Sequence, residues 1–368
     1  MTYAAKTREN QIAISLGRCA ASVKQAGSGH WEFALANGEP LGVSARLLEG
    51  WLLLDAPLPD RVGPGRWWDL LRLNATLQGL SKFVLRPAAR SSASCPTSFR
   101  LSESSGIGAE EADCGIERQT EVCRTPQYVH LRADIPPAGD EDFEGDCESE
   151  LDGILTTRLL DACSGLKGAF RSLRGEKSSE QPALTSSVNL EGQANNGVEE
   201  LRCLCGDAGW SFIERSAGRL MIELDVKSGF YQAVVQHRAE GAHVSVEIAR
   251  SEALAETSRQ ALSMLLLGTG ALVRLACPSI EETENQIVAR FEVRFTTMPT
   301  AVELAHAFAS LSVACAMSGR EARAIQDEVI ARHYLALGAQ ASLPASSGNS
   351  RKTKDKEQAG IPALQRTD

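Results

Sequence analysis

The most suggestive group of chemically active residues in the sequence is an acidic run, Asp140-Glu141-Asp142-Phe143-Glu144-Gly145-Asp146. Alternating oxygen ligands with a glycine at the sixth position are typical of a calcium-binding loop. The pattern then fails, because Leu151 stands at the twelfth position, where a bidentate glutamate is needed, and Pro136-Pro137 blocks the entering helix. We interpret the run as a solvated acidic loop whose later carboxylates favour the N-terminus of the following helix.

The other candidate site motifs are weaker. Gly268-Thr269-Gly270 has two glycines of a phosphate-binding turn, but a dinucleotide fingerprint needs a third glycine between a strand and a helix. We interpret this pair as the end of a helix that precedes a strand. The six histidines and ten cysteines are scattered without metal-ligand or catalytic spacing. We therefore expect no catalytic residue, no metal and no cofactor, and free thiols of the kind found in a reducing cytoplasm.

Three large aromatic side chains are candidates for contact with a partner. Aromatic residues make up only 5% of the chain, and an exposed tryptophan or phenylalanine is a frequent anchor in protein interfaces. Trp68 follows Trp67 at the start of a predicted helix, and the inward spacing of Trp67 with Leu70 leaves Trp68 toward the rim. Trp51 and Phe230 occupy the same strand position in an internal repeat, so both either fill cores or line a recurring surface. Core packing is the favoured interpretation for all three, and contact with a partner is the alternative that makes them candidates.

The sequence repeats itself at an offset of 179 residues. Four residues are identical among the 21 positions from Trp31 to Trp51, and the apolar matches alternate as in a strand. The identical pairs are Trp31 with Trp210, Phe33 with Phe212, Leu41 with Leu220, and Gly50 with Gly229. Further along the chain, the matching groups are Leu159 and Ala162-Cys163 with Leu311 and Ala314-Cys315. We interpret these matches as a duplicated unit of about 150 residues.

Hydrophobic periodicity gives both units the same order of elements. The expected helices cover residues 9–25, 67–80, 151–173, 198–206, 251–267, 300–317 and 320–337. The expected strands cover residues 31–34, 41–47, 51–55, 82–85, 98–101, 127–135, 210–213, 220–226, 231–237, 244–248, 271–276 and 286–296. Each unit is thus a helix, an antiparallel sheet interrupted by one helix, and a closing helix. That arrangement belongs to the α+β class, here as two tandem copies.

Composition divides the chain into four parts. Residues 1–173 form the first unit, which carries the acidic run and an inserted loop at 102–124, and residues 198–338 form the second unit. The polar stretch 174–197 has no apolar period and is the expected linker. Residues 339–368, which are rich in Ser, Gly, Lys and Gln, are an expected disordered tail.

The charge balance disfavours two classes of partner. The 368 residues include 47 acidic and 38 basic side chains, a net charge of -9, and such a surface repels nucleic-acid backbones and anionic lipid. The longest apolar stretch, Ala261 to Cys277, is too short and too interrupted to span a bilayer. The N-terminus lacks the apolar core of a signal peptide. We therefore expect an acidic cytoplasmic protein that binds no nucleic acid and does not insert into a membrane.

The element order resembles that of the class I type III secretion chaperones and the related YbjN-like proteins. The residues that carry the resemblance are Trp210 to Val226, Tyr231 to His237, Ser251 to Ala276, Gln286 to Thr296 and Thr300 to Met317, with their first-unit counterparts. The family has no diagnostic motif, and this chain departs from it by fusing two copies and by its acidic insertion and tail. The resemblance implies a protein without catalytic residues that holds an extended segment of an effector, with the two units paired like a dimer within one chain.

These observations predict a non-enzymatic protein-binding module, a chaperone or adaptor that captures an extended or amphipathic segment of a partner protein on sheet edges and apolar grooves. The second hypothesis is a structural subunit or scaffold of a larger assembly. The third is an enzyme that uses the carboxylates of residues 140–152, which requires that loop to fold into a cleft with a perturbed acid.

Overall fold

The computed structural model describes residues 3–20, 22–35, 40–58, 62–87, 127–137, 148–175, 191–216, 218–238 and 241–340. The possible strand at 98–101, the inserted loop at 102–124 and the acidic run at 140–146 lie outside the described residues. Most of the expected linker and the expected tail beyond Gln340 lie outside them as well.

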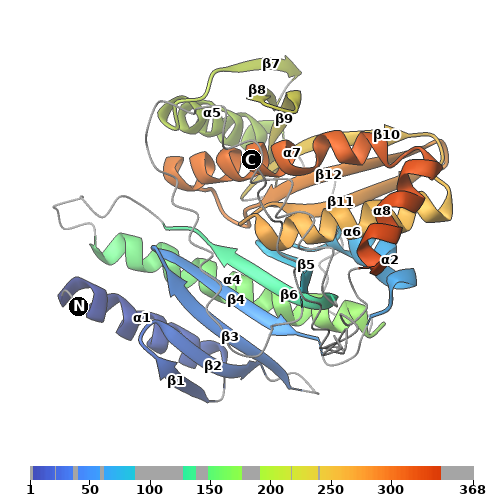
Figure 1. The fold of residues 1–368 in the computed structure, drawn as a ribbon. Helices are drawn as coiled ribbons and strands as arrows, with labels where there is room; N and C mark the ends of the chain where they lie inside the picture. The colour runs from blue at the N-terminus through green and yellow to red at the C-terminus, as the bar shows by residue number, and fades with distance from the viewer. Residues whose placement is uncertain are drawn as a thin grey trace, which may run out of the picture.

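Seven α-helices and two six-stranded antiparallel sheets make up the described part of the chain (Figure 1). The first unit consists of α1 (Tyr3–Cys19), β1 (Val23–Gly27), β2 (His30–Leu35), β3 (Leu41–Leu48), β4 (Trp51–Pro57), the 3-10 turn η1 (Pro64–Arg66), α2 (Trp67–Asn74), β5 (Ser81–Pro87), β6 (Gln127–Ile135) and α4 (Glu148–Leu173). The second unit consists of α5 (Glu191–Asp207), β7 (Phe212–Ser216), β8 (Arg219–Val226), β9 (Gly229–Arg238), β10 (Gly241–Ser251), α6 (Glu256–Leu272), β11 (Cys277–Thr283), β12 (Gln286–Arg294), α7 (Ala301–Ala324) and α8 (Glu328–Gln340). The predicted α+β class, with two tandem units of helix and antiparallel sheet, is confirmed.

Both sheets have the same strand order. The first sheet runs β1-β2-β3-β4-β6-β5, and the corresponding strands of the second run β7-β8-β9-β10-β12-β11. In each unit four strands form a meander, one helix follows, and the last two strands then add beside the fourth strand in reverse order. We call α2 and α6, the helices between the fourth and fifth strands, the middle helices.

The first hairpins of the two sheets correspond at an offset of 189 residues, which differs from the predicted 179, and the third strands correspond at 190. The corresponding pairs in the first hairpins are Val23–Phe33 with Phe212–Ile222, Lys24–Glu32 with Ile213–Met221, and Gln25–Trp31 with Glu214–Leu220. Each hairpin then shifts register and turns through a glycine at positive φ, Gly29 or Gly218. The predicted match of Trp31 with Trp210 is therefore wrong by one strand. Successive strands of a meander have the same alternation of inward apolar and outward polar residues. Apolar residues therefore also align when a strand of one unit is matched with the neighbour of its true counterpart in the other unit.

The core of each unit lies between the inner face of its sheet and the helices that cover it. Ile12 and Leu16 of α1 correspond at the same offset to Leu201 and Cys205 of α5, and all four side chains are fully buried. α4 crosses the first sheet at β6 and β5, and α7 crosses the second sheet at β10, β8 and β12. The offset of 189 therefore holds for the packing of the first helix as well as for the register of the first hairpin.

The middle helix of the second unit runs through the glycines that were expected to end it. α6 continues to Leu272, and the following strand begins at Cys277 in place of the predicted 271. A Cβ on Gly270 would lie 2.8 Å from Pro278 Cδ, so the glycine allows α6 to approach β11 closely. The interpretation of the glycine pair as a helix terminus is wrong for this reason.

Other element ends also differ from the predictions. α2 ends at Asn74, before the predicted residue 80, because the Asn74 side chain accepts a hydrogen bond from Phe83 N (2.7 Å) and donates one to Phe83 O (3.1 Å). β1 was not predicted, and α5 already begins at Glu191, within the expected linker. α7 continues to Ala324, so the predicted helix at 320–337 is in fact the end of α7 followed by α8.

The two units face one another through their middle helices. In Figure 1 the blue-to-green first unit lies below the yellow-to-red second unit, with α6 beside β5 and α2 beside β11. Each middle helix therefore packs on the sheet of the other unit, and α2 and α6 also contact each other. Within the described residues, one helix, α7, is long and apolar enough to cross a membrane. Leu304, Phe308 and Leu311 of α7 are fully buried against its own sheet, as in a core helix.

Candidate functional site

Trp51, the first predicted partner-binding residue, lies between the two units. It begins β4 and is 8% exposed. The Arg274 guanidinium lies 5.0 Å over its ring, and the His306 ring meets it edge-on at 5.0 Å between centroids. Both neighbours belong to the second unit, so Trp51 packs within the contact between the units.

Trp68 has a similar environment on α2. It is 9% exposed, its Nε1 donates a hydrogen bond to Glu282 Oε2 (3.4 Å), and the Arg259 guanidinium lies 5.2 Å over its ring. Arg259 in turn pairs with Glu282 at 3.1 Å. The expectation that Trp68 points toward an exposed rim is wrong, because the second unit covers that side of α2.

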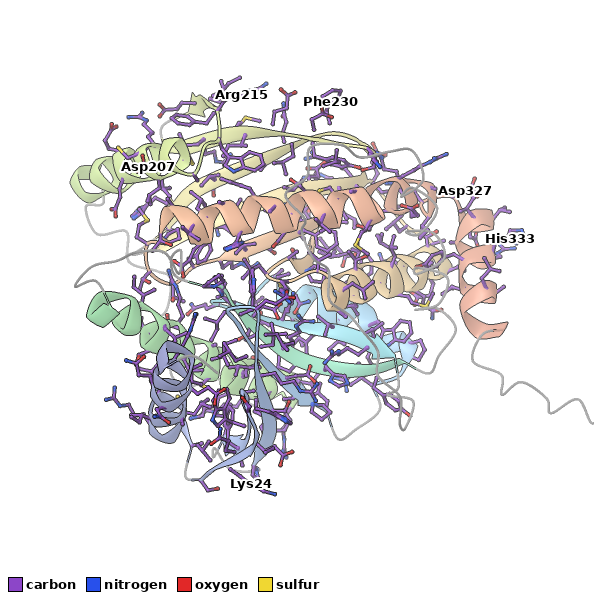
Figure 2. All side chains as sticks on the ribbon, turned by 60° about the vertical axis from the view of Figure 1, so that its left-hand side comes forward. Lys24, Asp207, Arg215, Phe230, Asp327 and His333 are labelled. Atoms are coloured by element: carbon purple, nitrogen blue, oxygen red, sulfur yellow. The ribbon has the colours of Figure 1, made fainter. Side chains whose placement is uncertain are left out.

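Phe230 is the one predicted residue with a large exposed surface. It lies on β9 opposite Asp225 of β8 and is 72% exposed. Figure 2 shows it at the outer edge of the molecule, away from the first unit. β4 corresponds to β10 in strand order, so Trp51 and Phe230 do not occupy equivalent positions. The idea that they form a recurring pair is wrong.

The first unit holds the end of α6 through a buried polar group. Lys82 Nζ donates hydrogen bonds to Val273 O (2.8 Å) and Ala276 O (3.2 Å) and pairs with Asp134 at 2.9 Å. Arg132 Nη1 donates to Ala271 O (2.6 Å), and its Nε pairs with Asp134 at 2.5 Å. The carbonyls at the C-terminus of α6 are thus bound by cations of the other unit, as a helix C-terminus favours.

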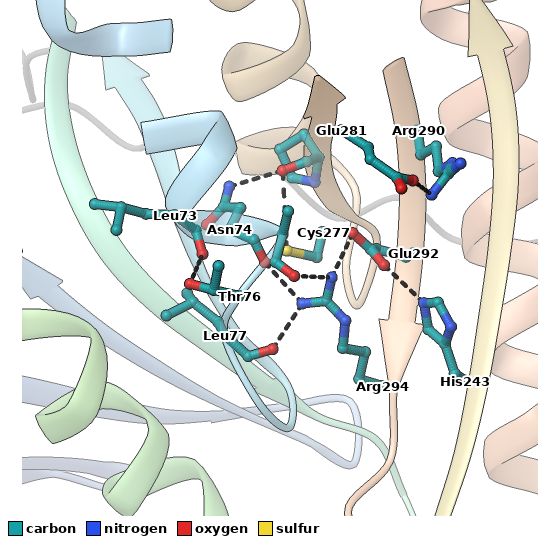
Figure 3. Close-up of polar contacts among 12 residues, drawn as sticks. Leu73, Asn74, Thr76, Leu77, His243, Cys277, Glu281, Arg290, Glu292 and Arg294 are labelled. Atoms are coloured by element: carbon teal, nitrogen blue, oxygen red, sulfur yellow. Dashed lines mark hydrogen bonds and ion pairs between the residues drawn. The ribbon is translucent and has the colours of Figure 1, made fainter. Parts of the chain in front are cut away.

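The second unit holds the end of α2 in return, as Figure 3 shows. Arg294 donates hydrogen bonds to three carbonyl oxygens, those of Asn74 (2.7 Å), Ala75 (3.0 Å) and Leu77 (2.6 Å). Arg294 also pairs with Glu292 at 2.5 Å. The contact is therefore reciprocal, since each unit caps the middle helix of the other.

Both carboxylates of this reciprocal contact are held in the charged form. Burial would raise the pKa of Asp134, but Arg132 and Lys82 lower it to about 2. Burial likewise acts to raise the pKa of Glu292, and the hydrogen bond from His243 (2.6 Å) and the charge of Arg294 outweigh it, so this pKa is also lowered. Each carboxylate forms an ion pair within its own unit, and these ion pairs hold the side chains that cap the middle helices.

The exposed outer face of the second sheet carries a row of apolar side chains. Ile213 on β7 stands opposite Met221 on β8, and Met221 stands opposite Val234 on β9. Ile213 is 70% exposed, whereas Met221 and Val234 are partly buried. We call these three residues together with the nearby Phe230 the outer strip. Large apolar side chains exposed together are a common mark of a protein-binding surface.

The first unit has polar residues at the equivalent places. Register equivalence relates Lys24 to Ile213 and Glu32 to Met221. Ser44, which stands opposite Glu32, corresponds to Val234. These three sheet positions thus accept a lysine, a glutamate and a serine in the first unit. The fold does not require the apolar row, which is a property of the second unit.

The surroundings of the outer strip carry charges of both signs and include a sheet edge. On the outer face of β8, Arg219 is exposed on one side of Met221, and Glu223 and Asp225 are exposed on the other side. β7 is the last strand of its sheet on this side, so its outer backbone groups are available for strand addition.

A histidine–aspartate pair lies on the outer face of the first sheet. His130 Nδ1 lies 3.0 Å from Asp55 Oδ2, and Arg86 pairs with the same oxygen at 2.9 Å. Burial acts to raise the pKa of Asp55, but the hydrogen bond to His130 and the charge of Arg86 lower it. The Asp55 carboxylate is therefore held in its charged form by these two partners.

The catalytic hypothesis concerns residues whose side chains the structure leaves undescribed. Residues 140–147 lie outside the described part, and although α4 begins at Glu148, the described side chains begin after Asp152. Among the described residues, no group of three or more His, Cys, Asp or Glu side chains has a geometry that could hold a metal ion.

The sequence predicts only part of the outer strip. The sequence names Phe230 as a candidate but places Ile213, Met221 and Val234 only on alternating strands. The signal that could identify them is an apolar residue at the outward positions of strands whose inward positions are already apolar. Strand register relates these positions to polar residues of the first unit, at an offset of 189 for Ile213 and Met221 and of 190 for Val234.

Comparisons of the chain with family models, with curated proteins and with solved structures gave no match. The resemblance to the class I type III secretion chaperones and YbjN-like proteins therefore stays a prediction that rests on element order.

Proposed function

We propose that this protein is a non-enzymatic binding module of chaperone or adaptor type, which holds an extended segment of a partner protein on the outer strip. The observation that carries the proposal is the apolar row Ile213, Met221 and Val234. The equivalent residues of the first unit are polar, although strand order and register are the same.

The geometry suits an extended segment in particular. A strand added beside β7 would form backbone hydrogen bonds along the sheet edge, and every second side chain would face the same side as Ile213. Phe230 offers an aromatic anchor further along that face. Glu223 and Asp225 favour basic residues at the Phe230 end of the partner segment, and Arg219 favours an acidic residue at the other end.

A substitution borrowed from the first unit tests this proposal. Ile213→Lys, Met221→Glu and Val234→Ser together give the second sheet the residues that the first sheet has at these positions, so we expect the triple variant to fold. We expect partner binding to weaken at least tenfold, because the apolar contact area is lost. The matched control replaces Glu32, at the equivalent place on the first sheet, with Gln and should weaken binding less than threefold.

The partner can be found by photo-crosslinking in the cells from which the protein comes. A benzophenone amino acid at position 230 should form adducts with one partner protein, and the same amino acid at position 24, on the first sheet, should not. The triple variant should abolish the adduct at 230. Adducts of equal yield at both positions, or an adduct that survives the triple variant, would overturn the proposal. An adduct only with a second copy of this chain would instead support the scaffold hypothesis.

A further inference from the structure

Two cysteines from distant parts of the first unit meet where α1 packs on α4. Cys19 is the last residue of α1 and is partly exposed, whereas Cys163 lies in the middle of α4 and is buried. Cys19 Sγ donates a hydrogen bond to Ser15 O at 3.6 Å on its own helix, and a hydrogen bond with the thiol of the other cysteine is the largest cause of the opposite pKa shifts of Cys19 and Cys163. One turn earlier on α1, the hydroxyl groups of Ser15 and Thr156 are 3.1 Å apart, which fixes the alignment of the two helices.

A lysine completes the group. Lys167 lies one turn after Cys163 on α4, and its Nζ donates a hydrogen bond to Cys19 O at 3.4 Å. The hydrogen bond from Cys163 lowers the pKa of Cys19 to about 7, and the charge of Lys167 acts in the same direction, against the effect of burial. The pKa of Cys163 is raised, first by its hydrogen bond to Cys19 and then by burial. The pair therefore consists of a partly exposed thiol with a lowered pKa and a buried thiol with a raised pKa.

The second unit shows that the fold does not require this group. Cys19 corresponds at the offset of 189 to Ala208, after the end of α5. The sequence match of α4 with α7 places Cys315 opposite Cys163 and Gly319 opposite Lys167. Cys315 is buried, and burial raises its pKa to about 12. The second unit thus has one inert cysteine where the first has two thiols and a cation.

We infer that Cys19 and Cys163 form a hydroperoxide-sensitive dithiol, with Cys19 as the nucleophile and Cys163 as the resolving thiol. The site and its ligand class are separate from the outer strip, so the inference does not depend on the proposed function. Cys19 is partly exposed at the end of α1, and the bond from Lys167 places it beside the part of α4 that carries Cys163.

The chemistry balances with a hydroperoxide as the oxidant. The Cys19 thiolate attacks one peroxide oxygen, the O–O bond breaks, and the departing oxygen takes up a proton to leave as an alcohol or water. Cys19 is then a sulfenic acid. The Cys163 sulfur attacks it, the S–O bond breaks, and hydroxide leaves as water with the thiol proton. Two thiols are oxidised by two electrons to one disulfide, which a dithiol reductant reverses.

Peptide mapping of the oxidised full-length chain tests the inference. The chain is exposed briefly to limiting hydrogen peroxide, free thiols are alkylated, and trypsin digestion is carried out without reductant. Cleavage after Arg18, Lys24, Arg158 and Lys167 releases both cysteines on short peptides. We expect a disulfide between the peptide 19–24 and the peptide 159–167, formed at a rate that rises with a midpoint near pH 7.

Three variants separate the roles. Cys163→Ser should stop the reaction at a Cys19 sulfenic acid, which a dimedone probe traps. Lys167→Met should move the pH midpoint upward, and Cys315→Ser, the matched control, should leave rate and midpoint unchanged. Circular dichroism checks that each variant is folded.

Two results would overturn the inference. One is oxidation of Cys19 in the folded wild-type chain no faster than oxidation of the exposed Cys203. The other is a wild-type map in which Cys19 is oxidised without the disulfide to Cys163.

Discussion

At the scale of single residues, each buried charged side chain in the described part of the chain has a partner of opposite charge. Lys82 and Asp134 are fully buried, and each is bound by the other and by groups of the second unit. Ionised side chains in such positions contribute little net stability as a pair, but the loss of one partner leaves the other charge uncompensated. We therefore expect a single substitution here to lower the free energy of unfolding by more than the ion pair as a whole contributes to it.

Asp134→Asn is expected to lower the free energy of unfolding by about 3–5 kcal/mol at pH 7, because Lys82 and Arg132 lose their common anion. The sign of the pH effect follows from the lowered pKa of about 2 for Asp134 in the folded protein, against about 3.9 in an unfolded chain. The stabilisation is complete above pH 4 and is lost as pH falls toward 2. Urea unfolding between pH 7 and 2.5 measures the difference between wild type and variant.

That difference should stay constant from pH 7 to 5 and shrink below pH 4. Asp225→Asn, on an exposed position of β8, is the control and should change the free energy of unfolding by less than 0.5 kcal/mol. A loss below 1 kcal/mol for Asp134→Asn, or a difference that grows on acidification, would contradict the assignment.

At the scale of secondary structure, the middle helices differ in how much they depend on the other unit. α2 has 8 residues and α6 has 17, and a helix of two turns is not stable alone. Arg294 alone binds three carbonyl oxygens at the end of α2, whereas Arg132 and Lys82 divide the three bonds at the end of α6 between them. We conclude that the end of α2 depends on one residue of the other unit, whereas the end of α6 depends on two.

Arg294→Lys should therefore loosen α2 selectively. A single ammonium group cannot reach the three carbonyls that the planar guanidinium bridges, so we expect a loss of about 2 kcal/mol and faster hydrogen exchange in residues 67–77. Arg132→Lys is the matched variant, and we expect it to leave exchange within α6 nearly unchanged. Hydrogen–deuterium exchange with peptide resolution measures both. Equal acceleration in α2 and α6 would contradict the asymmetry.

The same scale shows how much the sequence could predict. The element order and the α+β class follow from apolar periodicity, because helices and strands with one buried face have distinct periods. The correspondence between the units did not follow, since Trp31 aligns as well with Trp210 one strand away as with its true counterpart Leu220. The end of α6 was also unpredictable. Gly270 allows α6 to pack closely on Pro278 of the following strand, β11, and a rule for glycine at helix ends takes no account of such packing.

The candidate site was harder to predict than the fold. Trp51 and Trp68 have the residue type of a binding anchor, but their burial depends on Arg274 and Arg259 of the second unit. Such long-range contacts leave no trace in local spacing. The exposure of Phe230 depends in the same way on what the first unit leaves uncovered.

At the scale of the whole molecule, the order of charges makes the contact between the units specific. Arg132 and Asp134 of β6 correspond by strand register to Glu292 and Arg294 of β12, so the positive and negative residues exchange places. A further ion pair, Arg158 with Glu303 at 2.9 Å, joins α4 to the start of α7 and is also buried. These contacts join the two cores, and we expect the units to unfold together.

The charge order can be tested by reversing it in one unit. Glu292→Arg combined with Arg294→Asp gives the second unit the order of the first. It removes the three bonds from Arg294 to α2 and places a carboxylate at the negative end of that helix. Wild type should unfold in one calorimetric transition, whereas the reversed variant should show two, because each unit keeps its own core but loses the buried contact that couples it to the other. Glu247→Arg combined with Arg250→Glu reverses an exposed pair on the same sheet and should keep the single transition. One transition at the wild-type midpoint in the Glu292/Arg294 variant would mean that apolar packing alone couples the units, and that the reciprocal caps only orient them.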